Sequence, residues 1–192
     1  SQASATQRAG RAGRLGPGHC WRLWTEAEHR QRPLFDVPEM ESADLCALVL
    51  ELCAWGVTDT AELAWLSAPP AGALAQARGL LRQLGALDEH GRLTAMGHEL
   101  GALPVHPRLG RIVLASLKTS AFRLGCDIAA LLQAPDIVLR DSERGCDLDE
   151  RLEVLRLFRQ GVAKGVNART CRTVNQVATE LARHFKEAPS DG

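Results

Sequence analysis

The sequence lacks the features that define several protein classes. No apolar run approaches the ~20 residues that a membrane-crossing helix needs, and the first residues do not resemble a signal peptide. The six cysteines form no C-x-x-C pair, and the six histidines show no metal-ligand spacing with them. We therefore expect reduced, mostly buried thiols, no metal site, no membrane partner and a cytoplasmic location. The cysteines are Cys20, Cys46, Cys53, Cys126, Cys146 and Cys171.

Aromatic residues are also scarce, at 4% of the chain. Only Phe158 and Phe185 occur in the last third, and both fall on apolar stripes that we expect to be buried, so stacking of nucleic-acid bases on aromatic rings is poorly supplied there. Hydrophobic residues nevertheless make up 45% of the 192 residues. This content is enough for a real core and predicts one or two compact units.

Charge is unevenly distributed although the formal net charge is zero. Residues 1–32 carry six basic and two acidic groups, residues 33–100 carry three and ten, and residues 101–192 carry fourteen and eleven. Because exposed charges interact over only about 8 Å at physiological salt, this asymmetry predicts separate surfaces for separate partners. The basic regions are the candidates for binding phosphate.

The first 38 residues predict short elements separated by turns. Ser4–Gln7 has capping-box spacing and predicts a helix that runs to about Ala12. The stretch HCWRLWT, residues 19–25, alternates in a way that predicts a strand. A second capping box, Thr25–Glu28, predicts a short helix over residues 26–31.

The next segment, residues 39–100, has the element order of a winged helix. Apolar residues at helical spacing predict a helix between residues 42 and 56, a shorter one over 59–65, and a third over 70–85 that is closed by a glycine. Leu87 and Leu93 then flank an Asp-Glu-His-Gly turn, which predicts a small hairpin.

From residue 101 to residue 187 the pattern predicts four amphipathic helices, which must bury their stripes against one another in a small bundle. Residues 133–147 predict a loop, and residues 188–192 a tail. The four predicted stripes are Leu109, Ile112, Val113 and Leu117; Leu124, Ile128, Leu131 and Leu132; Leu148, Leu152, Leu155 and Phe158; and Cys171, Val174, Ala178, Leu181 and Phe185.

An arginine cluster near the start carries the most specific chemistry. Arg8 and Arg11 are three residues apart and share a helix face, and the break at Gly13 lets Arg14 turn toward the same place. Guanidinium groups stay charged and bind phosphate oxygens in pairs. A bare Arg-Gly stretch is also typical of disordered RNA-binding tracts and localisation signals; the capping box and the tryptophan-bearing stretch argue against disorder here.

The stretch Q-R-x-G-R-x-G-R over residues 7–14 resembles the sixth motif of the DEAH-box branch of superfamily 2 helicases. VPEMESADLCALVLELCAWGV is similar to that family's entry into its winged helix, and LTAMGHELGALPVHPRLGRIVLAS to the exit into its helical ratchet domain. CDIAALLQAPD resembles a ratchet helix. The stretches SATQRAGRAGRLGPGHCWRLW and LPVHPRLGR look most like the bacterial HrpB type.

This resemblance implies a mainly α chain in three parts. Residues 1–38 would form the edge of a second RecA-like α/β domain whose other strands lie upstream, leaving Trp21, Leu23, Trp24 and Phe35 exposed. Residues 39–100 would form the winged helix with its small β-hairpin. Residues 101–187 would form a helical, ratchet-like bundle.

The resemblance also implies site residues. Arg11 and Arg14 match the two arginine fingers that reach ATP bound with Mg²⁺ on the first RecA-like domain, and Gln7 matches the residue near the γ-phosphate and attacking water. Arg8, Gly10 and Gly13 would complete the nucleotide contacts. The sequence has no G-x-x-x-x-G-K-[ST] loop and no D-E-x-H box. We therefore expect these 192 residues alone not to hydrolyse ATP, and the upstream RecA-like domains of the same protein to be their partners.

Single-stranded nucleic acid is the expected second partner, with RNA favoured over DNA by the resemblance. Residues 151–186 carry eight basic and two acidic groups, a pattern that predicts either a sequence-independent track for the strand or an ordinary solvated face. DNA reading by the winged helix is not expected, because its third helix offers only Arg78 and Arg82. The candidate contacts are Arg156, Arg159, Arg169 and Arg172.

Two hypotheses remain open from the sequence. The first is the C-terminal part of a DEAH-type, ATP-dependent helicase. The second is a non-enzymatic winged-helix adaptor or regulator whose arginine cluster binds nucleic acid. Neither assigns a general base, since His106 and His184 have no paired acid or nucleophile in the sequence.

Overall fold

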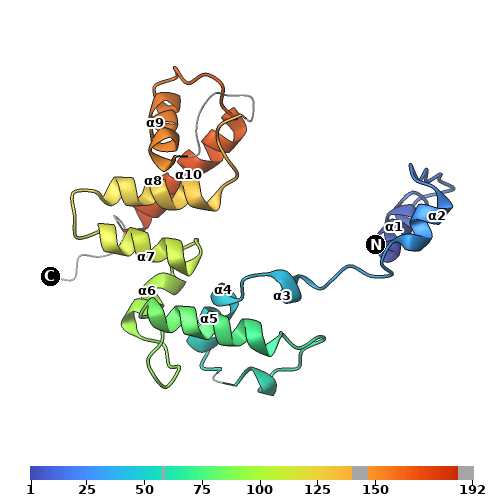
Figure 1. Ribbon diagram of the computed structural model, residues 1–192, viewed down its shortest axis with the longest axis horizontal. Coiled ribbons are helices and arrows are strands. Elements are labelled where there is room, and N and C mark those ends of the chain that lie inside the picture. Colours follow the sequence, from blue (N-terminus) through green and yellow to red (C-terminus); the bar gives the residue numbers. More distant parts are fainter. Residues whose placement is uncertain (58, 140–146, 186–192) are drawn as a thin grey trace. The chain divides into compact units, whose positions relative to one another are not determined.

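The computed structural model describes residues 1–57, 59–139 and 147–185. The chain divides into two units, Ser1–Asp44 and Leu45–Gly192, which are described separately (Figure 1). The protein is mainly helical, as expected. The three-part division predicted at residues 38 and 100 stays a prediction, and the predicted tail at 188–192 lies outside the described residues, as does Cys146.

The first unit is built around helix α1 (Gln2–Arg11). The helix begins earlier than predicted, because Ser1 caps it by accepting a 3.1 Å hydrogen bond from the Ser4 backbone amide. The capping box expected at Ser4–Gln7 is therefore wrong. Farther along the chain, the carbonyl oxygens of Pro33 and Leu34 accept bonds from the first two amides of α1, so this returning segment satisfies donors that a helix start otherwise leaves unpaired.

Helix α2 (Glu26–Gln31) confirms the second capping box. Thr25 Oγ1 accepts from the Glu28 amide at 3.2 Å, and the Glu28 carboxylate accepts from the Thr25 amide at 2.7 Å. The bond from the Thr25 amide, with a second from the Thr25 hydroxyl at 3.0 Å, lowers the pKa of the Glu28 carboxyl group. A third, four-residue helix, α3 (Glu39–Ser42), ends the unit.

The strand predicted over residues 19–25 is not formed. A strand needs a neighbour to pair its backbone groups, and none lies beside this segment within the first unit. Trp21 and Leu23 are exposed as expected, at 85% and 94%, and so is Phe35. Trp24 was wrongly expected to be exposed: it is half-buried, with the guanidinium carbon of Arg32 4.4 Å from the centre of its ring.

The second unit starts with the elements predicted for a winged helix: α4 (Cys46–Ala54), a 3₁₀ turn η1 (Thr60–Glu62) in place of the short helix, and α5 (Ala71–Gln83). Gly85, with φ of 76°, allows the chain to turn after α5. The hairpin is reduced to a single antiparallel bridge between Leu87 and Leu93. Helix α6 (Ala95–Gly101), which follows its N-cap Thr94, was not predicted.

Four longer helices complete the second unit: α7 (Pro107–Ser116), α8 (Phe122–Gln133), α9 (Leu148–Arg159) and α10 (Ala168–His184). Helix α8 packs against both α7 and α10 (Figure 1). The predicted loop between α8 and α9 contributes Val138, which forms an antiparallel bridge with Val166 before α10. The bundle predicted from the apolar stripes is therefore present.

The stripe predicted for α8 is confirmed only in part: Leu131 is buried and Ile128 is half-buried. Leu124 and Leu132 are about half exposed, whereas Cys126, Ala129 and Ala130 are buried. Small residues make this face because the helices approach closely. A Cβ atom added at Gly125 would lie 2.2 Å from the Ser116 hydroxyl oxygen of α7.

Candidate phosphate-facing arginines and nucleic-acid surface

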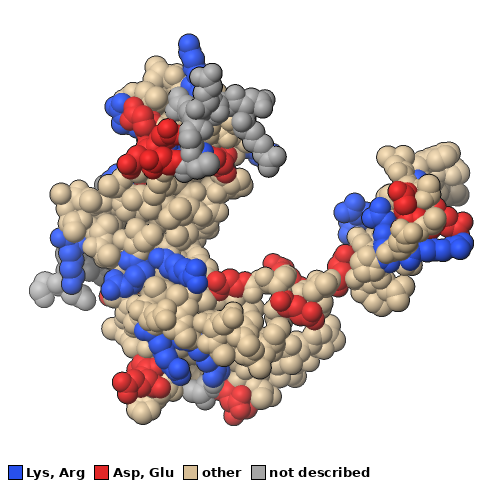
Figure 2. Space-filling view, in the orientation of Figure 1, with Lys and Arg blue, Asp and Glu red and all other residues tan. Residues whose placement is uncertain are grey.

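The arginine cluster lies on the last turns of α1 and the turn that follows. Arg8 and Arg11 belong to the helix, Arg14 lies in the turn, and all three are exposed, as is Gln7 (Figure 2 shows basic side chains gathered on this unit). Within the described residues, no acidic side chain forms an ion pair with Arg11 or Arg14. Their guanidinium groups are therefore available to an external anion.

Arg8 has an acidic group in reach. A hydrogen bond from the Ser1 hydroxyl is the main cause of the lowered pKa of Asp36, and the charge of Arg8 adds to this effect. The three arginines thus differ. Arg8 is coupled electrostatically to its own unit, whereas Arg11 and Arg14 are not coupled to any described carboxylate.

The glycines of this segment have different surroundings. Nothing in the chain lies within 4 Å of a Cβ built at Gly10, and the nearest atom at Gly13 is 3.8 Å away. A Cβ at Gly18, in contrast, would lie 1.8 Å from the Ala12 carbonyl oxygen. Gly18, which the sequence analysis did not single out, is therefore the residue that lets the turn fold back against the end of α1; the Gly-Pro-Gly run was its only signal.

Two of the four arginines predicted to bind nucleic acid form ion pairs within the second unit. Arg156 donates to Glu153 at 2.8 and 2.6 Å. Arg159 donates two bonds, of 2.7 and 2.6 Å, to the buried Asp127 of α8 and a third, of 2.8 Å, to the Asn175 amide oxygen of α10. The bonds to Asp127 raise the pKa of Arg159. Arg159 therefore joins three helices, a use that its spacing in the sequence did not indicate.

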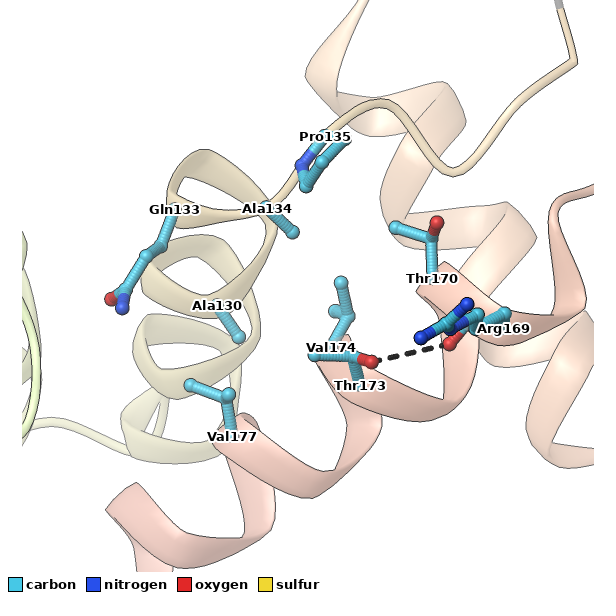
Figure 3. A pocket seen from close by; sticks show the side chains of 9 residues that line it. All are labelled: Ala130, Gln133, Ala134, Pro135, Arg169, Thr170, Thr173, Val174 and Val177. Carbon is cyan, nitrogen blue, oxygen red and sulfur yellow. Dashed lines mark hydrogen bonds between the residues drawn. The ribbon is translucent and has the colours of Figure 1, made fainter. Parts of the chain in front are cut away.

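The other two, Arg169 and Arg172, are exposed on the first turns of α10. In the described part of the chain neither guanidinium donates a hydrogen bond or forms an ion pair. Of the four candidate arginines, Arg169 and Arg172 are therefore the two whose charge no described side chain pairs, and the basic track stays a prediction. Arg169 also lines a pocket between α8 and α10 (Figure 3).

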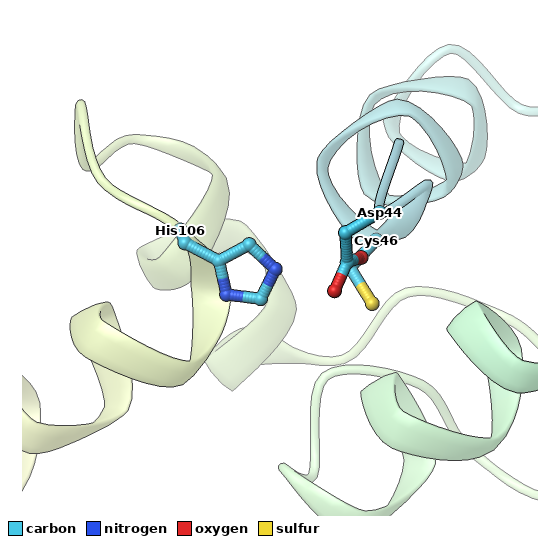
Figure 4. A group of neighbouring side chains, drawn as sticks. All are labelled: Asp44, Cys46 and His106. Atoms are coloured by element: carbon cyan, nitrogen blue, oxygen red, sulfur yellow. The ribbon is translucent and has the colours of Figure 1, made fainter. Parts of the chain in front are cut away.

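His106 lies at the start of a helix. Its Nδ1 accepts a 3.2 Å bond from the Arg108 amide as the N-cap of α7. The buried Cys46 thiol lies nearby, with its Sγ within 4.8 Å of a His106 ring nitrogen (Figure 4, which also shows Asp44, the last residue of the first unit). Two neighbouring ligand atoms in the second unit fall short of the four that a structural zinc ion takes, so no metal centre is assigned to this pair.

No helix among the described residues is long and apolar enough to cross a membrane.

Comparison with known proteins agrees with this architecture. Residues 77–105, from the second half of α5 to just before α7, match the winged-helix family described as helicase associated domain (HA2). The HrpB ATP-dependent RNA helicase of Escherichia coli is 41% identical over 135 residues, which are 70% of this chain and 17% of that protein. The pre-mRNA-splicing factor ATP-dependent RNA helicase prp22 of Schizosaccharomyces pombe is 36% identical over 152 residues, 79% of this chain and 13% of that protein.

Solved structures give the same result over almost the whole chain. The crystal structure of the Escherichia coli DEAH/RHA helicase HrpB covers 98% of this chain with a TM-score of 0.69 and 31% identity. The chain is a homologue of one segment of the DEAH/RHA helicases. It spans about a fifth of that structure and less than a fifth of the two helicases above. The segment that matches these helicases thus contains the winged helix and the bundle, together with the first unit, which carries the arginines.

Proposed function

We propose that this chain forms the C-terminal portion of an ATP-dependent RNA helicase of the HrpB type. The observation that carries the proposal is the pair Arg11 and Arg14, exposed and without an acidic partner among the described residues, at the end of a helix in the Q-R-x-G-R-x-G-R stretch. The similarity to ATP-dependent RNA helicases supports ATP, bound with a divalent metal, as the anion.

The chemistry of the site follows from charge. A phosphoryl group in transfer spreads negative charge over its oxygens, and an inserted guanidinium that stabilises this charge is worth roughly 10³ to 10⁵ in rate. In the proposal Arg11 and Arg14 supply these groups to a nucleotide held by other domains of the protein. Gln7 orients the attacking water near the γ-phosphate. Arg8 supports the phosphate side, and the open backbone at Gly10 and Gly13 allows the nucleotide to approach.

The second unit supplies the nucleic-acid contact. Arg169 and Arg172 present positive charge on one turn of α10, which suits a strand's phosphates without reading its sequence. Arg156 is a weaker candidate because Glu153 already neutralises it. The use of Arg159 in the bond to Asp127 argues against its contacting the strand. Nucleotide-driven movement between domains would then shift RNA relative to α10.

The test is Arg11→Ala in the full-length protein. We expect RNA-stimulated ATP hydrolysis to fall by about 10³ or more, while RNA binding without nucleotide changes little. Arg30→Ala is the matched control. Arg30 is an exposed arginine of the same unit that pairs with Glu26 on α2, and its loss should leave turnover unchanged.

Two results would contradict the proposal. Turnover that survives Arg11→Ala would remove the finger role. RNA binding without ATP hydrolysis in the unaltered full-length protein would favour the non-enzymatic adaptor instead. The cytoplasmic location expected from the sequence stays a prediction.

A further inference from the structure

A pocket opens between the end of α8 and the N-terminal half of α10 (Figure 3). Its volume is about 290 Å³, at the small end of the range of ligand sites in proteins. The walls are apolar, from Ala134 at the end of α8 and Val174 and Val177 of α10, and most of the exposed lining is apolar. The space suits one flat ring rather than an extended ligand.

Polar groups stand on one side of this apolar space. Arg169, Thr170 and Thr173 all come from the first turns of α10 (Figure 3). The Thr173 hydroxyl donates to the Arg169 carbonyl at 3.3 Å and keeps its acceptor capacity. The Thr170 hydroxyl makes no hydrogen bond to another described residue. Thr170, whose hydroxyl can donate and accept, and Thr173, whose hydroxyl can accept, offer polar contacts to the edge of a base without selecting one base.

The positive charge near the pocket indicates which kind of ligand the pocket binds. Arg169 lines the pocket and Arg172 lies three residues farther along α10, outside the lining; neither has an acidic partner in the described chain. A purely apolar side chain of another protein would gain nothing from them. A nucleotide uses both parts: the ring fills the apolar space, and the phosphate next to it binds the guanidinium.

We propose that this pocket holds one unstacked base of single-stranded RNA, with the adjacent phosphate on Arg169. The inference rests on the proposed function, since it assumes that RNA is the strand bound. It adds a base-binding site to a surface that otherwise contacts only the phosphate backbone. Binding should therefore respond to the presence of bases but not strongly to their identity.

The experiment measures the affinity of the full-length protein for two probes, a short oligouridine strand and the same strand with abasic nucleotides. Ala134→Phe places a ring in the pocket. We expect it to weaken binding of oligouridine about tenfold, because the added ring occupies the space that the base would fill, and to leave binding of the abasic strand unchanged. Ala115→Phe, at an exposed alanine of α7, is the control and should change neither.

A second variant does not depend on how α8 tolerates the larger residue. Arg169→Gln should weaken both probes and lower the slope of log affinity against log salt by about 0.7, the value for one phosphate contact on a single strand. The pocket inference is overturned if the unaltered protein binds both probes equally, or if Ala134→Phe weakens both alike. If RNA still stimulates ATP hydrolysis in that case, the proposed function survives. Failure of the unaltered protein to bind either strand would overturn both.

Discussion

The two units of this chain are ordered by different interactions. In the first unit, Ala5 is the one residue among 1–44 that is buried, and the unit relies on caps, on returning carbonyl groups and on the cation above Trp24. The second unit is built on apolar burial: Leu81, Leu100, Leu155 and Leu181 are almost fully buried. Local polar bonds therefore order the segment that carries the arginines, whereas an apolar core orders the helices of the second unit.

The exposed surface of the first unit also bears on this comparison. Trp21, Leu23 and Phe35 expose large apolar side chains on a segment of only 44 residues. Exposed apolar groups are what an edge that another domain covers would show. The expectation that the first unit is such an edge stays a prediction, since the second unit also exposes large apolar side chains, Trp55 and Leu66 among them.

The most direct test of this difference in apolar burial is to truncate one leucine in each unit. Leu81→Ala in α5 removes a side chain with no exposed surface, and we expect a loss of about 3 kcal/mol in the free energy of unfolding, as for other buried leucines. Leu23→Ala, at a residue that is 94% exposed, should cost almost nothing. Urea unfolding of the chain followed by circular dichroism measures both. Equal losses would show that the first unit has a core that its exposure does not reveal.

Substitution of one helical glycine in each unit should give a smaller contrast. A methyl group at Gly125 would lie 2.2 Å from the Ser116 hydroxyl oxygen, so Gly125→Ala should destabilise the packing of α7 on α8 by about 1–3 kcal/mol. At Gly10 nothing lies within 4 Å, and Gly10→Ala should stabilise α1 by up to about 1 kcal/mol through its higher helix propensity. Opposite signs in the two melting temperatures would support the comparison. A gain at Gly125 would contradict the close approach of these helices.

The same contrast explains what could be predicted from the sequence. Helical periodicity and capping signals located α2, α4, α5, α7, α9 and α10, because local spacing determines which face of a helix is apolar. The strand at residues 19–25 failed because pairing needs a neighbour outside these local signals. The buried face of α8 was predicted only in part, with Leu131 correct and the small residues missed, because close packing selects small residues and the periodicity of leucines does not record the distance to the next helix.

The candidate site also has some features that the sequence predicted and others that depend on tertiary packing. The spacing of Arg8, Arg11 and Arg14 was visible in the sequence, and the exposure of these residues agrees with it. The partner of Arg159 was not visible, because Asp127 is 32 residues away in the chain and meets it only through the packing of α8 against α9. Basic residues counted along a sequence therefore overstate a binding surface, since tertiary ion pairs use some of them.

The smallest expected effect concerns pH. Hydrogen bonds from Arg151 lower the pKa of Asp136, at the end of α8, below its ordinary value. A carboxyl group with a lowered pKa in the folded state stabilises the fold above its unfolded pKa of about 3.9. This contribution is lost as the pH falls through the folded pKa. Because Asp136 is half exposed, the effect should not exceed about 1 kcal/mol.

Asp136→Asn isolates this contribution. The variant should unfold at lower urea concentration than the unaltered chain at neutral pH, and the two midpoints should converge in acid, below the folded pKa of Asp136. Glu28→Gln is the counterpart in the first unit, where the capping box lowers the pKa of an exposed carboxyl group. Because Glu28 is exposed to solvent, Glu28→Gln should shift the midpoint less than Asp136→Asn does at neutral pH. A difference at Asp136 that persists in acid would mean that the asparagine disturbs the end of α8 by its shape, and the Arg151 charge would then contribute nothing measurable.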